Sequence, residues 1–203
     1  MVGSGYVGLV SGTCFADFGH DVVCIDKDPA KIAALEAGRM PIYEPGLAEL
    51  VARNVSAGRL SFSTDLPSAI IGADAIFIAV GTPSRRGDGH ADLTFVHEVA
   101  REVGEHLNAP AVVVTKSTVP VGTGDEVERI IAEAGCAVKY AVASNPEFLR
   151  EGAAIDDFKR PDRIVIGSDD EWARQVLGEV YRPLFLNRAP ILYPSRRSAE
   201  LIK

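Results

Sequence analysis

Three glycines near the start of the chain have the spacing of a loop that binds phosphate groups. Gly3-Ser4-Gly5-Tyr6-Val7-Gly8 follows the pattern G-x-G-x-x-G, in which Gly3 permits a tight turn and Gly5 lets a pyrophosphate approach the backbone. Gly8 would let the following helix pack closely against a sheet, and the N-terminus of that helix would offer free N–H groups to phosphates. Taken alone, the pattern is also compatible with an ordinary turn.

A carboxylate stands where a dinucleotide site needs one. Asp26 ends the apolar stretch Val22-Val23-Cys24-Ile25 about 20 residues after the loop, where it can accept hydrogen bonds from both hydroxyls of an adenosine ribose. Since an aspartate at this place repels a 2′-phosphate, the sequence predicts NAD rather than NADP as the cofactor. Lys27 and Lys31 are nearby cations that can accommodate such a phosphate, and Lys31 is also compatible with plain helix surface.

Polar, glycine-rich segments follow three apolar stretches later in the chain. They are Gly81-Thr82-Pro83, residues 116–123 (KSTVPVGT) and residues 144–151 (SNPEFLRE). Each segment alone could be a turn, because Gly, Pro, Ser and Asn are turn residues. Three such segments, each after a predicted strand, favour a single site at one edge of a sheet.

The elements that must position these residues alternate between strands and helices. Strands are predicted over residues 21–26, 60–63, 75–80, 111–115, 137–143 and 164–167, and an extended stretch over 190–193. Helices are predicted over residues 6–18, 46–56, 66–71, 93–107, 124–134 and 171–181, with others beginning at Asp28-Pro29 and at Ser195. This alternation predicts an α/β fold, a Rossmann-like doubly wound and mainly parallel sheet with helices on both faces. Since only Met1 and Val2 precede Gly3, we expect the first strand to be truncated.

Composition excludes several classes of function. The 203 residues are 47% hydrophobic and 24% charged, which is typical of ordinary globular domains. The net charge of −7 argues against general binding to nucleic acids or membrane surfaces. The sequence shows no apolar run of about 18 residues and no signal segment. Cys14, Cys24 and Cys136 are odd in number and unevenly spaced, which favours a reducing cytoplasm.

In their order along the chain, these segments resemble the NAD-dependent nucleotide-sugar 6-dehydrogenases. The matching strings are G-T-P, K-S-T-V-P-V-G-T and N-P-E-F-L-R-E-G after the dinucleotide loop, and the resemblance extends over essentially the whole chain. Residues 153–167 (AAIDDFKRPDRIVIG) and 195–203 (SRRSAELIK) are most similar to the members that act on UDP-glucose. Relatives that act on GDP-mannose or on UDP-N-acetyl-hexosamines share the early loops and stay as alternatives.

The resemblance implies a four-electron oxidation of a sugar C6 alcohol to a carboxylate, UDP-glucose giving UDP-glucuronate, with two molecules of NAD⁺ and a cysteine thioester. By similarity, Lys203 would stabilise the developing oxyanion, Glu147 would assist proton transfer and Thr118 would position a water. The sugar nucleotide would contact Glu147, Phe148, Leu149, Arg150, Glu151 and Lys203. Contacts with NAD would come from Gly3, Gly5, Tyr6, Val7, Gly8, Asp26, Lys31, Thr82, Ser117, Thr118 and Glu151.

The family's nucleophile is absent from this sequence. In the family it is a cysteine in a G-G-x-C-x-P-K-D segment of a C-terminal domain, whereas Cys14, Cys24 and Cys136 are better explained as small core residues. We therefore expect residues 1–190 to form an NAD-binding domain. Residues 191–203 would begin the helix that connects it to a substrate domain, in a homodimer when the enzyme is complete. The chain alone should be inactive.

Simpler interpretations remain for several single residues. Glu147 and Glu151 lie four residues apart and could be an exposed helical pair, and Lys203 could be a solvated lysine. The arginines that follow are most simply explained as surface or ion-pair residues, namely Arg160, Arg163, Arg196 and Arg197.

Other classes of protein share parts of the pattern. A reductase of the 6-phosphogluconate or 3-hydroxyacyl type would have the same dinucleotide fold, but it would lack the K-S-T-V-P-V-G-T and N-P-E-F-L-R-E strings. A non-catalytic module that senses NAD would explain the missing nucleophile. A zinc alcohol dehydrogenase is disfavoured, and no metal site is predicted, because the four histidines and the cysteines show no ligand spacing.

Overall fold

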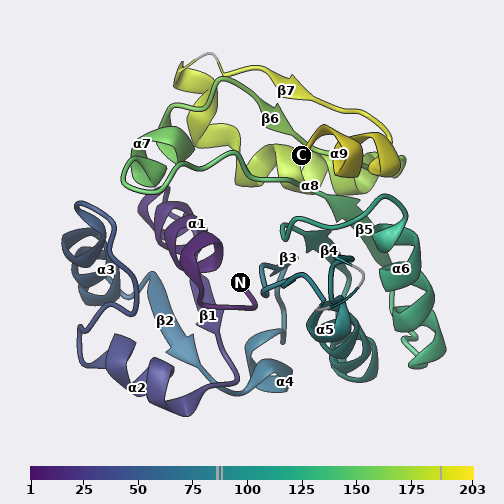
Figure 1. The fold of residues 1–203 in the computed structure, drawn as a ribbon, viewed down its shortest axis with the longest axis horizontal. Coiled ribbons are helices and arrows are strands. Elements are labelled where there is room, and N and C mark those ends of the chain that lie inside the picture. Colours follow the sequence, from purple (N-terminus) through teal and green to yellow (C-terminus); the bar gives the residue numbers. More distant parts are fainter. Residues whose placement is uncertain (86, 88, 188) are drawn as a thin grey trace.

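A parallel β-sheet with helices on both faces forms the centre of the molecule (Figure 1). The structure is a computed structural model that describes residues 1–85, 87, 89–187 and 189–203. Strand β1 (Val22–Ile25) pairs in parallel with β2 (Leu60–Ser63). Strand β4 (Ala111–Thr115) pairs in parallel with β3 (Ala75–Ile78) on one side and with β5 (Tyr140–Ser144) on the other. The predicted doubly wound, mainly parallel sheet is confirmed.

Val2 joins the two groups of strands, with Met1 and Gly3 bonded to Ile25 of β1 on either side of it. Val2 forms parallel bridges to Ile25 in β1 and to Ile78 in β3. The N–H of Val2 donates to the carbonyl of Phe77, and its carbonyl accepts from the N–H of Ala79, both at 2.7 Å. With Val2 in the place of a first strand, the order across the sheet is the 3-2-1-4-5-6 order of dinucleotide-binding folds. The predicted first strand is thus reduced to this bridge, at the middle of the sheet.

Helices form the connections between the strands. They are α1 (Tyr6–Asp17), α2 (Pro29–Glu36), α3 (Leu47–Ser56), α4 (Leu66–Ala69), α5 (Thr94–His106), α6 (Thr123–Glu133), α7 (Ala154–Lys159), α8 (Glu171–Val180), the 3-10 segment η1 (Arg182–Asn187) and α9 (Arg196–Ile202). The side chains of Asp28, Asp170 and Ser195 cap α2, α8 and α9, as their residue types predict. The sequence does not predict α7 or η1, since α7 is six residues long and has no capping side chain at Ala153.

Apolar side chains pack on both faces of the sheet. On one face Phe15 of α1, Phe77 and Phe158 of α7 form a cluster in which the Phe15 ring centroid is 5.1 Å from each of the others. On the other face α5 and α6 cover β3 and β4. All five residues of β4 are buried, as expected for a continuous apolar strand. Cys14 and Cys24 are buried and Cys136 is half-buried, and all three are free thiols.

The last part of the chain returns to the edge of the sheet beside β5. Strand β6 (Ile164–Val165) pairs in parallel with β7 (Ile191–Leu192), and an antiparallel bridge joins Gly167 to Ser144 at the end of β5. Helix α9 follows β7 and packs against β5 near α6 (Figure 1). The mainly parallel sheet is therefore extended by one antiparallel contact. Among the helices of the described residues, none combines the length and the hydropathy of a membrane span.

Candidate dinucleotide and substrate site

The three glycines of the first loop have three different surroundings. A Cβ on Gly3, whose φ is +99°, would lie 2.7 Å from the carbonyl oxygen of Ala79. A Cβ on Gly8 would lie 1.8 Å from the carbonyl oxygen of Gly3, so α1 can approach the loop only without a side chain there. By contrast, no protein atom lies within 4 Å of a Cβ built on Gly5. The space in front of Gly5 is open, as a pyrophosphate bound at the N-terminus of α1 requires.

A cavity of about 430 Å³ extends from this loop along the carboxyl ends of β1 and β3. We call it the β1–β3 cavity. It lies on both sides of Val2, at the point where the strand order reverses, which is where doubly wound sheets bind their ligands. Its lining includes Gly3, Gly5, Asp26, Lys31, Gly81 and Phe95.

Asp26 is held in the β1–β3 cavity by three donors. Its carboxylate accepts from the N–H of Ser4 at 3.0 Å, from the N–H of Asp28 at 3.1 Å and from Nζ of Lys31 at 2.6 Å. Burial by itself raises the pKa of Asp26, but the hydrogen bonds from Lys31 and the backbone outweigh it and lower the pKa below its ordinary value. Asp26 is therefore an ionised acceptor in a fixed place, and the charge of Lys31 is turned toward it.

The loops after β3 and β4 are joined by side-chain hydrogen bonds. The hydroxyl of Ser117 donates to the carbonyl of Val80 at 2.6 Å, and the hydroxyl of Thr82 donates to the carbonyl of Thr118 at 2.8 Å. Thr118 itself is exposed at this edge of the sheet. The structure thus brings Thr82, Ser117 and Thr118 together, as the shared edge of parallel strands predicts.

Lys203 reaches from the end of α9 to the segment after β5. Its Nζ donates to the backbone carbonyl of Glu147 and to Oε1 of the same residue, both at 2.7 Å. The two side chains are 22% and 11% exposed, so the Lys203 ammonium is paired with Glu147 rather than free in solvent. Residues 145–150 form no helix, so the interpretation of Glu147 and Glu151 as a helical pair is wrong.

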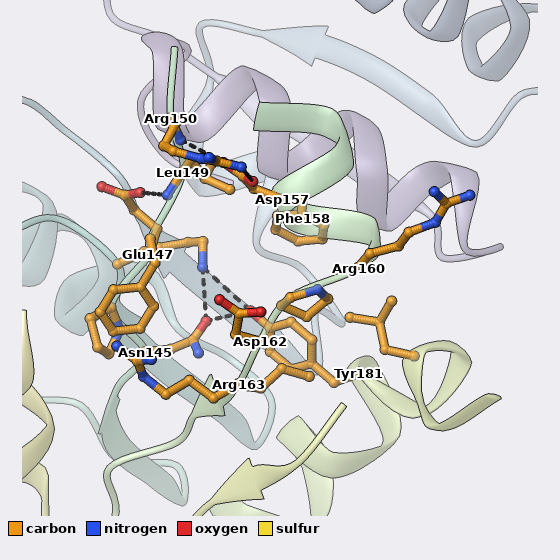
Figure 2. Close-up of a pocket in the computed structure, with 16 residues that line it drawn as sticks. Asn145, Glu147, Leu149, Arg150, Asp157, Phe158, Arg160, Asp162, Arg163 and Tyr181 are labelled. Atoms are coloured by element: carbon orange, nitrogen blue, oxygen red, sulfur yellow. Dashed lines mark hydrogen bonds and ion pairs between the residues drawn. The ribbon is translucent and has the colours of Figure 1, made fainter. Parts of the chain in front are cut away.

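A second pocket, of about 420 Å³, lies against the segment that contains Glu147 (Figure 2). Lys116 lies in its lining with only 2% of its surface exposed. The Lys116 Nζ donates to Oδ1 of Asn145 at 3.0 Å and to the hydroxyl of Tyr181 at 3.3 Å, and both acceptor residues are labelled in Figure 2. Both acceptors are neutral, and burial lowers the pKa of Lys116 to about 8. The sequence places Lys116 in a candidate loop but gives no sign of this burial.

Other residues that the sequence predicts to contact the cofactor or the sugar nucleotide lie at the margin of this arrangement. Val7 is half-buried in α1, and Glu151 is exposed in the turn before α7. Arg150 forms an ion pair with Asp157 at 2.6 Å, and Leu149 lies in the wall of the second pocket. Phe148 lies under the guanidinium of Arg163, which is 4.8 Å from the ring centroid.

The four arginines that the sequence explains most simply as surface or ion-pair residues have different surroundings in the structure. Arg196 and Arg197 both pair with Asp125 in α6, at 2.5 and 2.7 Å. Arg160 lines the second pocket together with Arg163. Within the described residues, no group of three histidine, cysteine, aspartate or glutamate side chains is placed to hold a metal ion.

Known proteins are similar to this chain in sequence and in structure. Residues 1–185 match the family described as UDP-glucose/GDP-mannose dehydrogenase family, NAD binding domain. The chain is 66% identical over 205 residues to a UDP-glucose 6-dehydrogenase of Rhizobium meliloti, in an alignment that covers 100% of this chain and 47% of that protein. It is 52% identical over 204 residues to UDP-glucose 6-dehydrogenase TuaD of Bacillus subtilis, covering 100% of this chain and 43% of that protein.

Two solved structures extend the comparison to three dimensions. A UDP-glucose dehydrogenase from Pyrobaculum islandicum superposes with a TM-score of 0.94 at 49% identity, covering 99% of this chain and 46% of that chain. A ternary complex of GDP-mannose dehydrogenase from Pseudomonas aeruginosa gives a TM-score of 0.93 at 38% identity, covering 100% of this chain and 47% of that chain. The chain spans about half the length of the curated relatives it matches.

Proposed function

Because the chain belongs to the UDP-glucose/GDP-mannose dehydrogenase family, we propose that it supplies the NAD-binding part of an enzyme that oxidises C6 of UDP-glucose to the carboxylate of UDP-glucuronate. The observation that carries the proposal is the open space at Gly5 beside the fixed carboxylate of Asp26. Phosphate oxygens would lie at the N-terminus of α1, and the adenosine ribose would donate its hydroxyls to Asp26. Bound NAD⁺ would supply the hydride acceptor.

The ion pair of Glu147 and Lys203 supports a role in the chemical steps. The Lys203 ammonium is held beside Glu147 at the carboxyl edge of the sheet, where it would stabilise negative charge on a sugar C6 oxygen. Glu147 would assist proton transfer, and the exposed Thr118 would position a water. Phe148, Leu149, Arg150 and Glu151 would line the path of the sugar nucleotide, with Glu151 close to the nicotinamide ribose.

Substrate, domain boundary and assembly follow from the family resemblance. UDP-glucose is favoured over GDP-mannose because the identity is 66% to the Rhizobium UDP-glucose enzyme and 38% to the GDP-mannose enzyme. We place the NAD-binding domain at residues 1–190, and the start of the connection to a substrate domain with the cysteine nucleophile at residues 191–203. A homodimer and a cytoplasmic location complete the proposal, the latter favoured by three free cysteines.

Calorimetric titration of the chain with NAD⁺ and NADP⁺ tests the cofactor site. NAD⁺ should bind at least about 10-fold more tightly than NADP⁺, since Asp26 repels a 2′-phosphate.

Gly5→Ala should keep the melting temperature but weaken NAD⁺ binding about 10-fold or more, because its Cβ meets no protein atom and would enter the phosphate space. Gly178→Ala in α8, where a Cβ would make an ordinary contact at 3.5 Å, is the matched control. Equal affinities for both cofactors, or undiminished binding by Gly5→Ala, would overturn the assignment.

A further inference from the structure

A carboxylate is buried between the dinucleotide loop and the segment that follows Arg150. Glu44 lies in the loop between α2 and α3 and is 6% exposed. Its Oε2 accepts from the N–H of Gly152 and its Oε1 from the N–H of Ala154, both at 2.8 Å. It also accepts a short hydrogen bond from the hydroxyl of Tyr6. Glu44 thus contacts two parts of the chain that are remote from it in sequence.

Tyr6 connects this carboxylate to the place where a pyrophosphate would bind. It is the first residue of α1, directly after Gly5, and its hydroxyl also accepts from the N–H of Gly152 at 3.2 Å. Gly152 lies one residue beyond Glu151, at the end of the segment proposed to line the path of the sugar nucleotide. A continuous chain of hydrogen bonds therefore runs from the dinucleotide loop, through Tyr6 and Glu44, to residues 152–154.

The protonation states fix the direction of these hydrogen bonds. Burial alone raises the pKa of Glu44, but the bonds from Tyr6, Gly152 and Ala154 outweigh it and lower the pKa below its ordinary value. Burial and the neighbouring Glu44 raise the pKa of Tyr6 to about 12. At neutral pH the carboxylate is therefore a pure acceptor and the phenol a donor, and all three bonds are charge-assisted.

We propose that Glu44 is a positioning residue that couples the dinucleotide loop to residues 150–154, so that a bound cofactor fixes the end of the segment that lines the substrate path. The inference rests on the proposed function. A pyrophosphate that orders the first turn of α1 would order Tyr6, and Tyr6 would hold Glu44 against the N–H groups of Gly152 and Ala154. Bound NAD⁺ would thereby raise the affinity of this segment for a nucleotide sugar. By thermodynamic linkage, a bound nucleotide sugar would raise the affinity for NAD⁺ by the same factor.

Amide hydrogen exchange of the chain, with and without saturating NAD⁺, tests the coupling. Without cofactor, Glu44→Gln should speed exchange about 10-fold or more at Gly152 or at Ala154, because its NH₂ group would face one of these two N–H donors while its oxygen accepts from the other. Tyr6→Phe keeps both backbone bonds to Glu44 but removes the contact of the Gly152 N–H with the Tyr6 hydroxyl, so its cofactor-free exchange should rise less than that of Glu44→Gln. Exposed neighbours provide matched controls, Glu49→Gln for the first variant and Tyr43→Phe, at a residue 86% exposed, for the second.

The cofactor-dependent change separates coupling from simple anchoring. NAD⁺ should slow exchange over residues 150–154 in the wild type and in both controls, and this slowing should be lost in Tyr6→Phe at a concentration that calorimetry shows to be saturating. Undiminished slowing in Tyr6→Phe, or wild-type exchange at Gly152 and Ala154 in Glu44→Gln, would overturn the proposal. A wild-type chain that binds no NAD⁺ would overturn the proposed function and the coupling with it, while the cofactor-free comparison would still decide whether Glu44 holds the segment.

Discussion

Lys116 places an ammonium group in the interior with only neutral hydrogen-bond acceptors. The hydroxyl of Tyr181 donates to Oδ1 of Asn145 at 2.5 Å, and the side chain N–H of Asn145 donates to the carbonyl of Val165 at 2.8 Å. Lys116 donates to the first two of these groups and so completes a network that links β4, β5, β6 and the end of α8. This charge lies beside Glu147, whose field favours the charged form. The arrangement costs folding free energy, because burial of a charge outweighs its neutral hydrogen bonds.

Replacing this lysine should stabilise the chain in a pH-dependent way. The folded-state pKa of about 8 lies below the ordinary value of 10.5, so the cost is full below pH 8, shrinks between pH 8 and 10.5, and vanishes above. At about 1.4 kcal/mol per pH unit, Lys116→Met should raise the free energy of unfolding at pH 7 by up to about 3 kcal/mol. Urea unfolding at pH 7 and at pH 9.5 should show the gain shrinking at the higher pH.

The exposed Lys27, with 73% of its side chain accessible, offers a matched control. Lys27→Met should change the free energy of unfolding little and equally at both pH values, as expected for a surface residue. A pH-independent effect of Lys116→Met would contradict the account of a charge that is buried at a cost.

Single residues differ in how far their role can be predicted from sequence. The roles of Gly3, Gly8 and Asp26 follow from a local pattern, because the loop, the helix and the strand that use them are contiguous. Glu44 carries no such pattern, since its two backbone donors lie 108 and 110 residues away. Lys116 likewise donates to the hydroxyl of Tyr181, which lies 65 residues away in the sequence. Only the folded chain shows which remote groups meet them.

At the level of elements, α9 is fixed to α6 by a buried carboxylate. Glu200 is 5% exposed and accepts from the N–H of Gly122 at 2.6 Å and of Gly124 at 2.7 Å. These N–H groups stand at the N-terminus of α6, where an anion interacts favourably with the helix dipole. Because Lys203 follows α9 directly, this contact also helps to set the place of the ammonium beside Glu147.

Glu200→Gln should therefore destabilise the chain and loosen α9. The amide keeps one acceptor but presents a donor to an N–H group, so the free energy of unfolding should fall by about 1–3 kcal/mol. Urea unfolding measures the loss, and Glu105→Gln at an exposed position of α5 is the control. An unchanged midpoint for Glu200→Gln would show that the carboxylate contributes nothing to docking of α9.

Helices and strands could be predicted from the sequence where adjacent residues determine them. Continuous apolar stretches predict β3 and β4, and the Asp28-Pro29 pair predicts the start of α2, since strand burial and helix capping depend on adjacent residues. Helix α7 depends instead on remote packing, with the ring of Phe158 5.1 Å from that of Phe15 and 6.3 Å from that of Tyr181. Short elements held by such contacts leave no periodic pattern in the sequence.

For the whole molecule, the connection through Val2 sets how the sheet can open. Among the described residues, β2 pairs with β1 and β1 also bridges to Val2, whereas β4 is buried along its length and paired on both sides. Native-state hydrogen exchange should show the amides of β4 opening only with global unfolding, and those of β1 and β2 opening at a lower free energy. Equal opening free energies and equal denaturant dependence in both groups would mean that Val2 and α1 bind the sheet into one cooperative unit.

The carboxylate of Glu200 also occupies the N–H groups at the start of α6 to which a phosphate could otherwise bind. Glu200 is a tethered ligand, present at an effective concentration in the millimolar range or above, so a free phosphate must compete with it for the N–H groups of α6. At the N-terminus of α1 no side chain caps the helix and no acidic residue stands in the first turn. Of these two helix starts at the same edge of the sheet, only that of α6 is bonded to a carboxylate of the chain itself. The N–H groups at the start of α6 are thus already bonded to a carboxylate, whereas those at the start of α1 are bonded to no side chain.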